Sequence, residues 1–361
     1  MPQHPLAQFG WTEFFEEHFR PHLKSGLEPG RVSFQDNVGY RVYTTAGELL
    51  ATMTGRLRHE AATREALPAV GDWVALKIRP NEGRAVVHAI LPRRSGFARK
   101  VAGSRTEQQI VRANIDTVFL VSSLNQDFSP RRIERYLTLA WESGADPVIV
   151  LSKADLCADV SNLVAEVNAV AGGVPVHPLS VVTGDGLEAL RSYLRVGETV
   201  ALLGSSGVGK STLINRFLGY ERQRVMEVRA SDERGQHATR NRELIPLPEG
   251  GLLLDTPGMR ELQLWEGGRG VEVTFDDIEE LARECNFTDC RHEEEPRCAV
   301  RAAVTTGRLD PGRLESYHKL RREVKHFQLR QDDLARRLDK EKWKKLGRLA
   351  KERARRKREG D

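Results

Sequence analysis

Apolar and polar residues alternate in short runs over the first part of the chain. Five such runs between Arg31 and Leu91 are separated by turn residues, among them Gly71-Asp72, and this pattern predicts five short β-strands. Five short strands within about sixty residues are typical of a small closed barrel of the OB type. Ahead of the barrel, aromatic residues at helical spacing between Trp11 and His22 predict a short amphipathic helix.

From Ala113 onward the pattern changes to apolar runs that alternate with stretches of helical periodicity. Strands alternating with helices predict an α/β domain built around a parallel sheet. The expected strands are 116–121, 147–151, 174–179, 199–203 and two between 244 and 254.

The last part of the chain, from Arg313 to Glu359, is helix-forming and increasingly basic. Apolar residues at helical spacing predict that its first half packs against another element. The basic end is either a solvated charge run or a tail that contacts RNA, and we prefer the second interpretation. The spaced apolar residues are Leu314, Tyr317, Leu320, Val324 and Phe327.

Composition narrows the class of protein. The 361 residues are 30% charged and 39% hydrophobic, which is ordinary for a soluble chain of two or three domains. No apolar run approaches the roughly 18 residues that span a bilayer, and acidic residues stand where a signal peptide would be basic and then apolar. Three of the four cysteines are clustered, which argues against a disulfide scaffold. We therefore expect a cytoplasmic protein without membrane contacts.

Positive side chains are concentrated in and just after the expected barrel, although the net charge of the chain is only +5. OB-type barrels often bind RNA, and positive charge favours contact with phosphates. A structural barrel with an ordinary charged surface is the alternative, and we prefer RNA binding. The positive residues are Arg41, Arg56, Arg58, Arg84, Arg93, Arg94, Arg99 and Lys100.

An apolar run, a glycine-rich loop and a helical stretch follow one another around residue 204. The loop fits G-x-x-x-x-G-K-S, whose glycines let backbone N–H groups cradle phosphate oxygens before a helix. Lys210 would reach the β- and γ-phosphates, which makes it a candidate catalytic residue, and Ser211 would hold Mg²⁺. A plain glycine turn is the alternative, and the flanking elements favour a nucleoside triphosphate site. The expected contacts are Gly204, Ser205, Ser206, Gly207, Val208, Gly209, Lys210, Ser211 and Thr212.

Ser152-Lys153-Ala154-Asp155 follows an expected strand and differs by one residue from the guanine-reading pattern N-K-x-D. The Asp155 carboxylate can accept hydrogen bonds from guanine N1–H and N2–H₂, a donor pair that adenine lacks. Lys153 would lay its aliphatic stem along the base, and Ser152 replaces the usual supporting Asn, so we expect weaker support of the loop. An exposed helix cap is the alternative, and the position after a strand favours a guanine site.

Asp255-Thr256-Pro257-Gly258 follows the last apolar run and fits the switch pattern D-x-x-G. Asp255 would hold Mg²⁺ through water, and the Gly258 N–H would sense the γ-phosphate; a simple turn is the alternative. The guanine-reading motif precedes the phosphate loop, the reverse of the usual order in GTPases. This order predicts a circularly permuted GTPase domain.

Three cysteines and one histidine occur within fourteen residues: Cys285, Cys290, His292 and Cys298. This donor set forms a closed tetrahedral site for one structural Zn²⁺. Unpaired core cysteines are the alternative, but the acidic stretch 293–295 between the ligands is not core sequence.

Together these motifs resemble the circularly permuted, ribosome-small-subunit-dependent GTPases of bacterial small-subunit maturation, over nearly the whole chain. The resemblance also rests on 67–74, Gln109 with Ala113-Asn114, and Arg131-Arg132-Ile133-Glu134-Arg135-Tyr136-Leu137. It implies that Ser180 and Val181 touch the guanine, that the zinc spacing is shared, and that the partners are the small ribosomal subunit and its rRNA.

The resemblance also places a switch-one segment at His237-Ala238-Thr239, with Thr239 facing Mg²⁺. Met259 stands where many GTPases have a water-orienting Gln, so we expect slow hydrolysis until the small subunit stimulates it. His237 is a candidate for positioning the water, and a structural or RNA-facing histidine is the alternative.

The predicted organisation has four parts: an N-terminal helical extension (1–30), an OB-type RNA-binding barrel (31–100), the permuted GTPase domain (101–272) and a helical zinc domain with a basic tail (273–361). The predicted function is a monomeric, subunit-stimulated GTPase that binds GTP, GDP, Mg²⁺ and Zn²⁺ and leaves the subunit on hydrolysis. A guanine-nucleotide-gated RNA-binding module with incidental hydrolysis is the main alternative. A metabolic P-loop kinase is disfavoured by Asp155.

Overall fold

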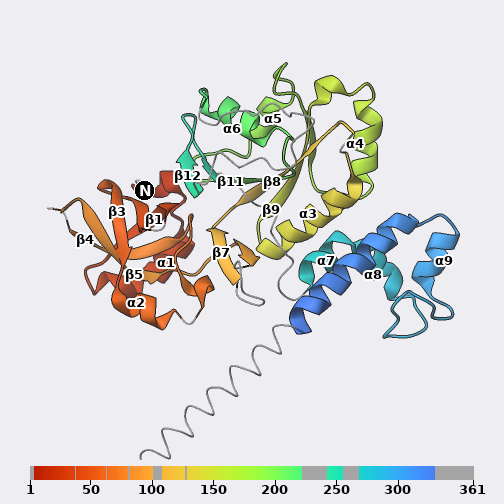
Figure 1. Ribbon diagram of the computed structural model, residues 1–361, viewed down its shortest axis with the longest axis horizontal. Helices are drawn as coiled ribbons and strands as arrows, with labels where there is room; N and C mark the ends of the chain where they lie inside the picture. Colours follow the sequence, from red (N-terminus) through yellow and green to blue (C-terminus); the bar gives the residue numbers. More distant parts are fainter. Residues whose placement is uncertain are drawn as a thin grey trace, which may run out of the picture.

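The structure is a computed structural model that describes residues 4–36, 38–61, 63–79, 82–100, 108–126, 128–221, 242–254 and 268–329. It has three parts: a small barrel, a central α/β domain and a C-terminal helical module (Figure 1). The barrel and the C-terminal module lie on different sides of the central domain. Among the described helices, none has the length and apolar character needed to cross a membrane.

The expected barrel is present and closed. Its strands pair in the order β1-β2-β3-β5-β4, and β4 pairs back with β1. Alternate residues such as Val32, Val42, Leu76 and Val87 point inward and are fully buried, because side chains of a strand face opposite sides in turn. The strands are β1 (Glu28–Gln35), β2 (Tyr40–Thr44), β3 (Gly47–Met53), β4 (Trp73–Arg79) and β5 (Arg84–Ile90), with α2 (Gly55–Glu60) and η2 (Arg64–Ala66) between β3 and β4.

The N-terminal segment covers one side of the barrel. It contains η1 (Ala7–Phe9) and the expected helix, α1 (Glu13–Leu23). Phe15 and Phe19 of this helix pack with Trp11 against Trp73 of β4, in a cluster of tilted and edge-on rings. This apolar seam makes the N-terminal segment part of the barrel unit.

The central domain has a parallel sheet with helices on both faces, as expected. Successive residues of β8 alternate between two cores: Val118 and Leu120 face one, Phe119 and Val121 the other. The strand order is β10-β9-β8-β11-β13. The elements are β8 (Thr117–Ser123), α3 (Pro130–Ser143), β9 (Asp146–Ser152), η4 (Ala154–Leu156), α4 (Val160–Asn168), β10 (Val176–Leu179), α5 (Leu187–Arg191), β11 (Thr199–Leu203), α6 (Lys210–Leu218), β12 (Arg242–Pro246) and β13 (Leu252–Leu254).

The barrel and the central sheet are joined edge to edge through β12. This strand runs antiparallel to β13 on one side and to β1 on the other, with Phe34 opposite Glu243. The Tyr43 hydroxyl donates to the Leu244 carbonyl oxygen at 3.1 Å, and Arg41 forms an ion pair of 3.4 Å with Glu243. The result is one eleven-stranded sheet across two domains, which the sequence pattern did not predict.

A two-stranded hairpin, β6 (Gly96–Lys100) and β7 (Gln108–Ala113), spans the domain boundary expected after residue 100. The barrel likewise begins at Glu28, ahead of the expected boundary at residue 31. Near the hairpin, the buried Arg31 guanidinium donates to the carbonyl oxygens of Gly71, Phe9 and Asn114 at 3.2, 2.5 and 2.8 Å. One barrel side chain therefore holds backbone from three segments together.

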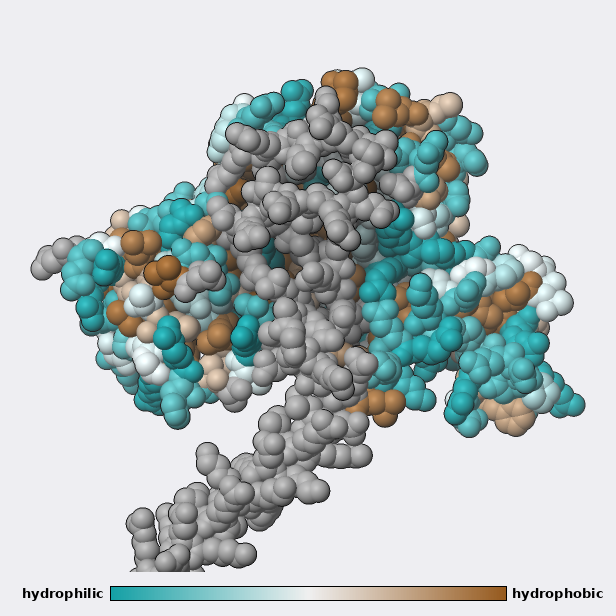
Figure 2. All heavy atoms as spheres, viewed as in Figure 1, coloured by the Kyte–Doolittle hydropathy of each residue, from teal (hydrophilic) through white to brown (hydrophobic). Residues whose placement is uncertain are grey.

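The C-terminal module is helical and begins with α7 (Arg269–Thr274), followed by α8 (Asp276–Ala282) and α9 (Ala299–Thr305). Residues 311–329 are also helical. Tyr317, Leu320 and Val324 of this last helix are buried with Phe275 and other core residues, which confirms the expected packing of its apolar side chains. Hydrophilic residues cover most of the visible surface of the module (Figure 2). The expected basic tail lies outside the described residues.

Candidate nucleotide site and metal centre

The loops with the candidate site residues lie at the carboxyl ends of the strands of the central sheet. Strands β9, β10, β11 and β13 run parallel, so their carboxyl ends face the same way. Ser152 ends β9, Ser180 follows β10, and Gly204 follows β11. This edge is where open α/β sheets bind ligands, so the topology brings the guanine and phosphate motifs together.

The phosphate-binding loop has the backbone that its sequence requires. Gly207 and Gly209 have φ values of 78° and 93°, a region that favours glycine. A Cβ atom on Gly204 would collide with the carbonyl oxygen of Val121. Helix α6 starts at Lys210 directly after the loop, so its free N–H groups and positive dipole end face the same place.

The ammonium group of Lys210 folds back over this loop. Its Nζ donates to the carbonyl oxygens of Gly204 and Ser205 at 2.8 and 2.5 Å. Ser206 and Gly207 at the loop tip are exposed, and Ser211 and Thr212 are half-buried in the first turn of α6. One short segment therefore provides a lysine ammonium group and two hydroxyl groups in the first turn of a helix.

Ser152 connects the guanine motif to the phosphate loop. Its hydroxyl donates to the carbonyl oxygen of Val208 at 2.6 Å and lies 3.3 Å from that of Ser122. The expected weakening of support is therefore offset by a short bond to the loop itself. Lys153 follows with a positive φ of 60°, and this turn leaves Asp155 exposed at the start of η4.

The loop after β10 is held by its own backbone. Ser180 N–H donates to the Asp185 carbonyl oxygen at 3.0 Å, and Gly184 N–H donates to the Ser180 carbonyl oxygen at 2.9 Å. The Ser180 hydroxyl accepts from the Thr183 N–H at 3.2 Å. This closed turn leaves Val181 half-buried beside the guanine motif's strand.

Four candidate site residues lie outside the described part of the chain: His237, Thr239, Asp255 and Gly258. Met259 lies outside it as well. Strand β13 ends at Leu254, next to β11, so the D-T-P-G motif directly follows a strand of the expected kind.

The four candidate zinc ligands come together. The two sulfurs of Cys285 and Cys298 are 3.8 Å apart, and they lie 3.6 and 3.4 Å from Nδ1 of His292. All four ligand atoms, with Cys290 Sγ, are within 4.8 Å of one another. A tetrahedral Zn²⁺ with ordinary bond lengths separates sulfurs by about 3.8 Å and sulfur from nitrogen by about 3.5 Å. The donor set and its spacing fit zinc.

The loop that carries these ligands is shaped by Glu295. Its carboxylate accepts from the N–H groups of Arg291, Glu293 and Glu294 at 2.8, 2.9 and 3.2 Å. These bonds, that from Arg291 first, lower the pKa of Glu295 to about 2. Burial lowers the pKa of His292, which keeps the imidazole in the neutral form that binds metal.

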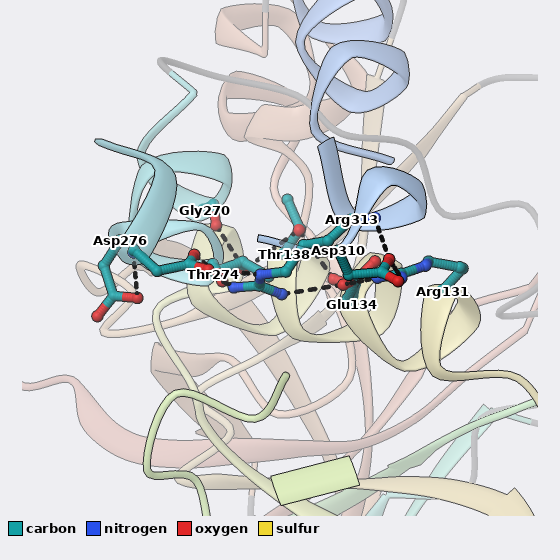
Figure 3. A network of polar contacts seen from close by, with 9 residues as sticks. Arg131, Glu134, Thr138, Gly270, Thr274, Asp276, Asp310 and Arg313 are labelled. Atoms are coloured by element: carbon teal, nitrogen blue, oxygen red, sulfur yellow. Dashed lines mark hydrogen bonds and ion pairs between the residues drawn. The ribbon is translucent and has the colours of Figure 1, made fainter. Parts of the chain in front are cut away.

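Helix α3 was not among the predicted site elements, yet it touches both functional regions. The Tyr136 hydroxyl lies 3.1 Å from Oγ of Ser205 in the phosphate loop. On the side of the C-terminal module, the buried Glu134 carboxylate accepts from Arg313 at 2.9 Å (Figure 3). Both α3 residues stand in the stretch 131–137 that carries the family resemblance, which was the available signal.

The positive side chains of the barrel region are not equally available to RNA. Arg93 is bonded to the buried Asp72 carboxylate at 2.7 and 2.8 Å and to two backbone carbonyl oxygens. Arg93 therefore has a structural role in the barrel. Arg58 and Arg84 are exposed, and Arg56 is exposed with an ion pair to Glu60.

Known proteins resemble this chain over most of its length. The model of the RsgA GTPase family matches residues 90–265. A "Small ribosomal subunit biogenesis GTPase RsgA" from Opitutus terrae is 48% identical over 359 residues, covering 96% of this chain and 98% of that protein. The chain belongs to the RsgA GTPase family. Another RsgA, from Methanosarcina acetivorans, is 43% identical and covers 93% of this chain and 90% of its own.

Solved structures agree with this RsgA assignment. YjeQ from Thermotoga maritima has a TM-score of 0.61 and 27% identity, covering 81% of this chain and 97% of its own. YloQ, called a circularly permuted GTPase, has a TM-score of 0.60 and 25% identity, covering 83% and 96%. The predicted OB-type barrel, permuted GTPase domain and helical Cys₃His module are confirmed, as is the assignment to the GTPases.

Proposed function

We propose that this RsgA-family chain hydrolyses GTP during biogenesis of the small ribosomal subunit, and that the subunit stimulates the reaction. The observation that carries the nucleotide part is the joining of the guanine and phosphate motifs at one sheet edge, where Ser152 bonds the Val208 carbonyl oxygen at 2.6 Å. The relatives named small ribosomal subunit biogenesis GTPases support the biological part.

Asp155 binds the guanine N1–H and N2–H₂ groups in this proposal, since its carboxylate is exposed at the carboxyl end of β9. Lys153 covers the base, and the Ser180–Val181 turn contacts it from the other side. The backbone N–H groups of the phosphate loop and Lys210 bind the β- and γ-phosphates. Four of the roles, those of His237, Thr239, Asp255 and Gly258, rest on sequence motifs alone.

A magnesium ion in such a site would neutralise negative charge on the phosphates. Ser211 fits such an ion, since its hydroxyl stands in the first turn of α6 directly after the phosphate loop. Thr239 and Asp255 are the further proposed magnesium residues, on motif evidence. Zinc bound by Cys285, Cys290, His292 and Cys298 stabilises the C-terminal module and leaves no position for substrate.

Barrel and basic tail provide the proposed RNA contacts, with exposed Arg58 and Arg84 among the barrel residues. GTP orders the switch segments and favours the subunit-bound state, and hydrolysis favours release. The monomeric state and the cytoplasmic location belong to the same proposal.

Turnover of GTP and of ATP, each with and without purified small subunits, tests this function. We expect the protein to hydrolyse GTP but not ATP, and we expect the GTP turnover rate to rise strongly when small subunits are added. Equal GTP turnover in both conditions, with intact nucleotide-dependent binding, would support the RNA-binding module with incidental hydrolysis instead.

The Asp155→Asn variant tests the guanine assignment. An amide can donate to the O2 of xanthine, where guanine carries N2–H₂, so the variant should prefer XTP. Loss of a charge-assisted bond predicts GTP affinity reduced by about 10- to 100-fold. The exposed Asp159→Asn in the N-cap of α4 is the control, with unchanged nucleotide preference.

A further inference from the structure

Helix α3 lies between the phosphate loop and the C-terminal module. Ile133 and Leu137 fix it to the sheet, where both side chains are buried. Its other faces carry polar residues that reach in two directions, toward Ser205 and toward Arg313. Because α3 is rigid and contacts both the phosphate loop and the C-terminal module, a displacement of α3 at one of these contacts also moves the other.

On the phosphate side, the contact is the bond between Tyr136 and Ser205, 3.1 Å long. Ser205 is also one of the two residues whose carbonyl oxygens accept from Lys210 Nζ. In the structure Lys210 lies on these loop carbonyl oxygens, whereas phosphate binding requires its ammonium group to reach the β- and γ-phosphates. The position of Ser205 therefore bears on how readily Lys210 leaves the loop.

On the module side, α3 is held by buried and bidentate ion pairs. The Arg313 guanidinium bonds Glu134 and the Thr274 carbonyl oxygen, each at 2.9 Å (Figure 3). It also bonds Asp277 at 2.7 and 2.8 Å. Arg135 bonds both carboxylate oxygens of Glu323, at 2.6 and 2.8 Å. Ion pairs therefore hold residues 134 and 135 to the module, and residue 136 contacts the phosphate loop.

At Gly270, helix α7 approaches the backbone of α3 closely. A Cβ on Gly270 would collide with the Thr138 carbonyl oxygen, and the Gly270 N–H donates to Glu142 at 2.9 Å. Thr138 and Thr274 also share a hydroxyl bond of 3.2 Å (Figure 3). Because packed backbones do not compress, movement of α7 must displace α3.

We propose that α3 transmits binding of the ribosomal subunit from the C-terminal module to the phosphate loop, with Tyr136 as the positioning residue that acts through the Ser205 hydroxyl. This inference rests on the proposed function. The two-state element is Lys210 with its loop: both nucleotide and the module act on it, which is the physical requirement for coupling.

The decisive variant is Tyr136→Phe, which removes one hydroxyl and keeps the ring. We expect kcat with saturating small subunits to fall about five-fold, the size of one neutral hydrogen bond. KM for GTP, turnover without subunits and subunit affinity should stay within about two-fold. Tyr193→Phe is the matched control, since its hydroxyl bonds His177 at 3.0 Å in the other core of the domain; it should keep full stimulation.

Two further variants test the route. Glu323→Gln breaks the ion pair with Arg135 far from the nucleotide, and stimulated kcat should fall about two-fold. Combined with Tyr136→Phe it should add little, since residues that act through one path are not additive. Full additivity would overturn the route.

Turnover of the unaltered protein and of Tyr136→Phe, each with and without subunits, separates this inference from the proposed function. Stimulation of the unaltered protein together with unchanged stimulated kcat in Tyr136→Phe overturns the inference alone. Equal loss with and without subunits also overturns it, because Tyr136 would then only stabilise the loop. Absence of stimulation in the unaltered protein overturns both.

Discussion

The hydroxyl of Ser152 donates to the carbonyl oxygen of Val208 across 2.6 Å. These residues are distant in sequence, and each belongs to a loop that recognises a different part of the proposed nucleotide. The bond fixes the distance between the loop that recognises the base and the loop that recognises the phosphates. Because the Ser152 side chain is buried, water does not replace the bond when it is lost.

Replacing Ser152 by Ala should weaken binding of GDP and GTP alike. Loss of this buried bond leaves the Val208 carbonyl oxygen without that donor and costs about 1 kcal/mol, or about five-fold in affinity. Titration with a fluorescent guanine nucleotide measures the change. Ser192→Ala, whose exposed hydroxyl bonds only within its own turn, is the control, and equal affinities of the two variants would contradict the prediction.

Arg313→Met should destabilise the protein strongly. The substitution leaves the buried Glu134 carboxylate without one of its two arginine partners, and breaking a buried ion pair costs about 3 kcal/mol. Denaturant unfolding gives the free energy directly. The exposed Arg308→Met is the control, and a difference between the variants below about 1 kcal/mol would show that Arg131 suffices.

Zinc removal should unfold the C-terminal module. We expect one Zn²⁺ per chain by metal analysis, and a Cys298→Ser variant that loses it together with helical signal from the module. Cys157→Ser is a matched control, because Cys157 is the cysteine outside the Cys₃His cluster. Retention of full zinc in Cys298→Ser would rule out the four-ligand site.

Stability should fall as the pH falls below about 6.5, in part through His177. Burial lowers the pKa of His177 from the usual 6.5, so the unfolded chain binds this proton more readily than the folded chain. The loss begins near the unfolded pKa and levels off below the folded one. We compare unfolding at about pH 7 and at about pH 5. Between these values His177→Gln should lose less stability than the unaltered protein, and an equal loss in both would contradict the prediction.

The elements that follow local rules were predictable from the sequence. The phosphate loop, the Asp155 turn and the zinc ligands depend on short spacings, and strand alternation sufficed for the barrel. The edge pairing of Phe34 with Glu243 and the bond between Tyr136 and Ser205 were not predictable in this way. Both join residues far apart in sequence, and no periodicity encodes which distant edges or side chains meet.

Ion-pair clusters show the same limit. Glu134 occurs in a motif with several charges, and a charged residue in a helix ordinarily predicts an exposed face. In the structure its side chain is fully buried by Arg313 from a helix near the end of the chain. Only the tertiary arrangement shows that the charge is structural.

The pairing of β12 with β1 also covers the outer edge of the central sheet. An outer strand has unpaired N–H and C=O groups that can add a strand from another molecule. The barrel occupies this edge of β12. A shortened chain that begins after the barrel would expose the edge, so we expect it to aggregate at concentrations where the full chain stays dispersed. We therefore expect the barrel to keep the GTPase domain dispersed, in addition to its proposed RNA contacts.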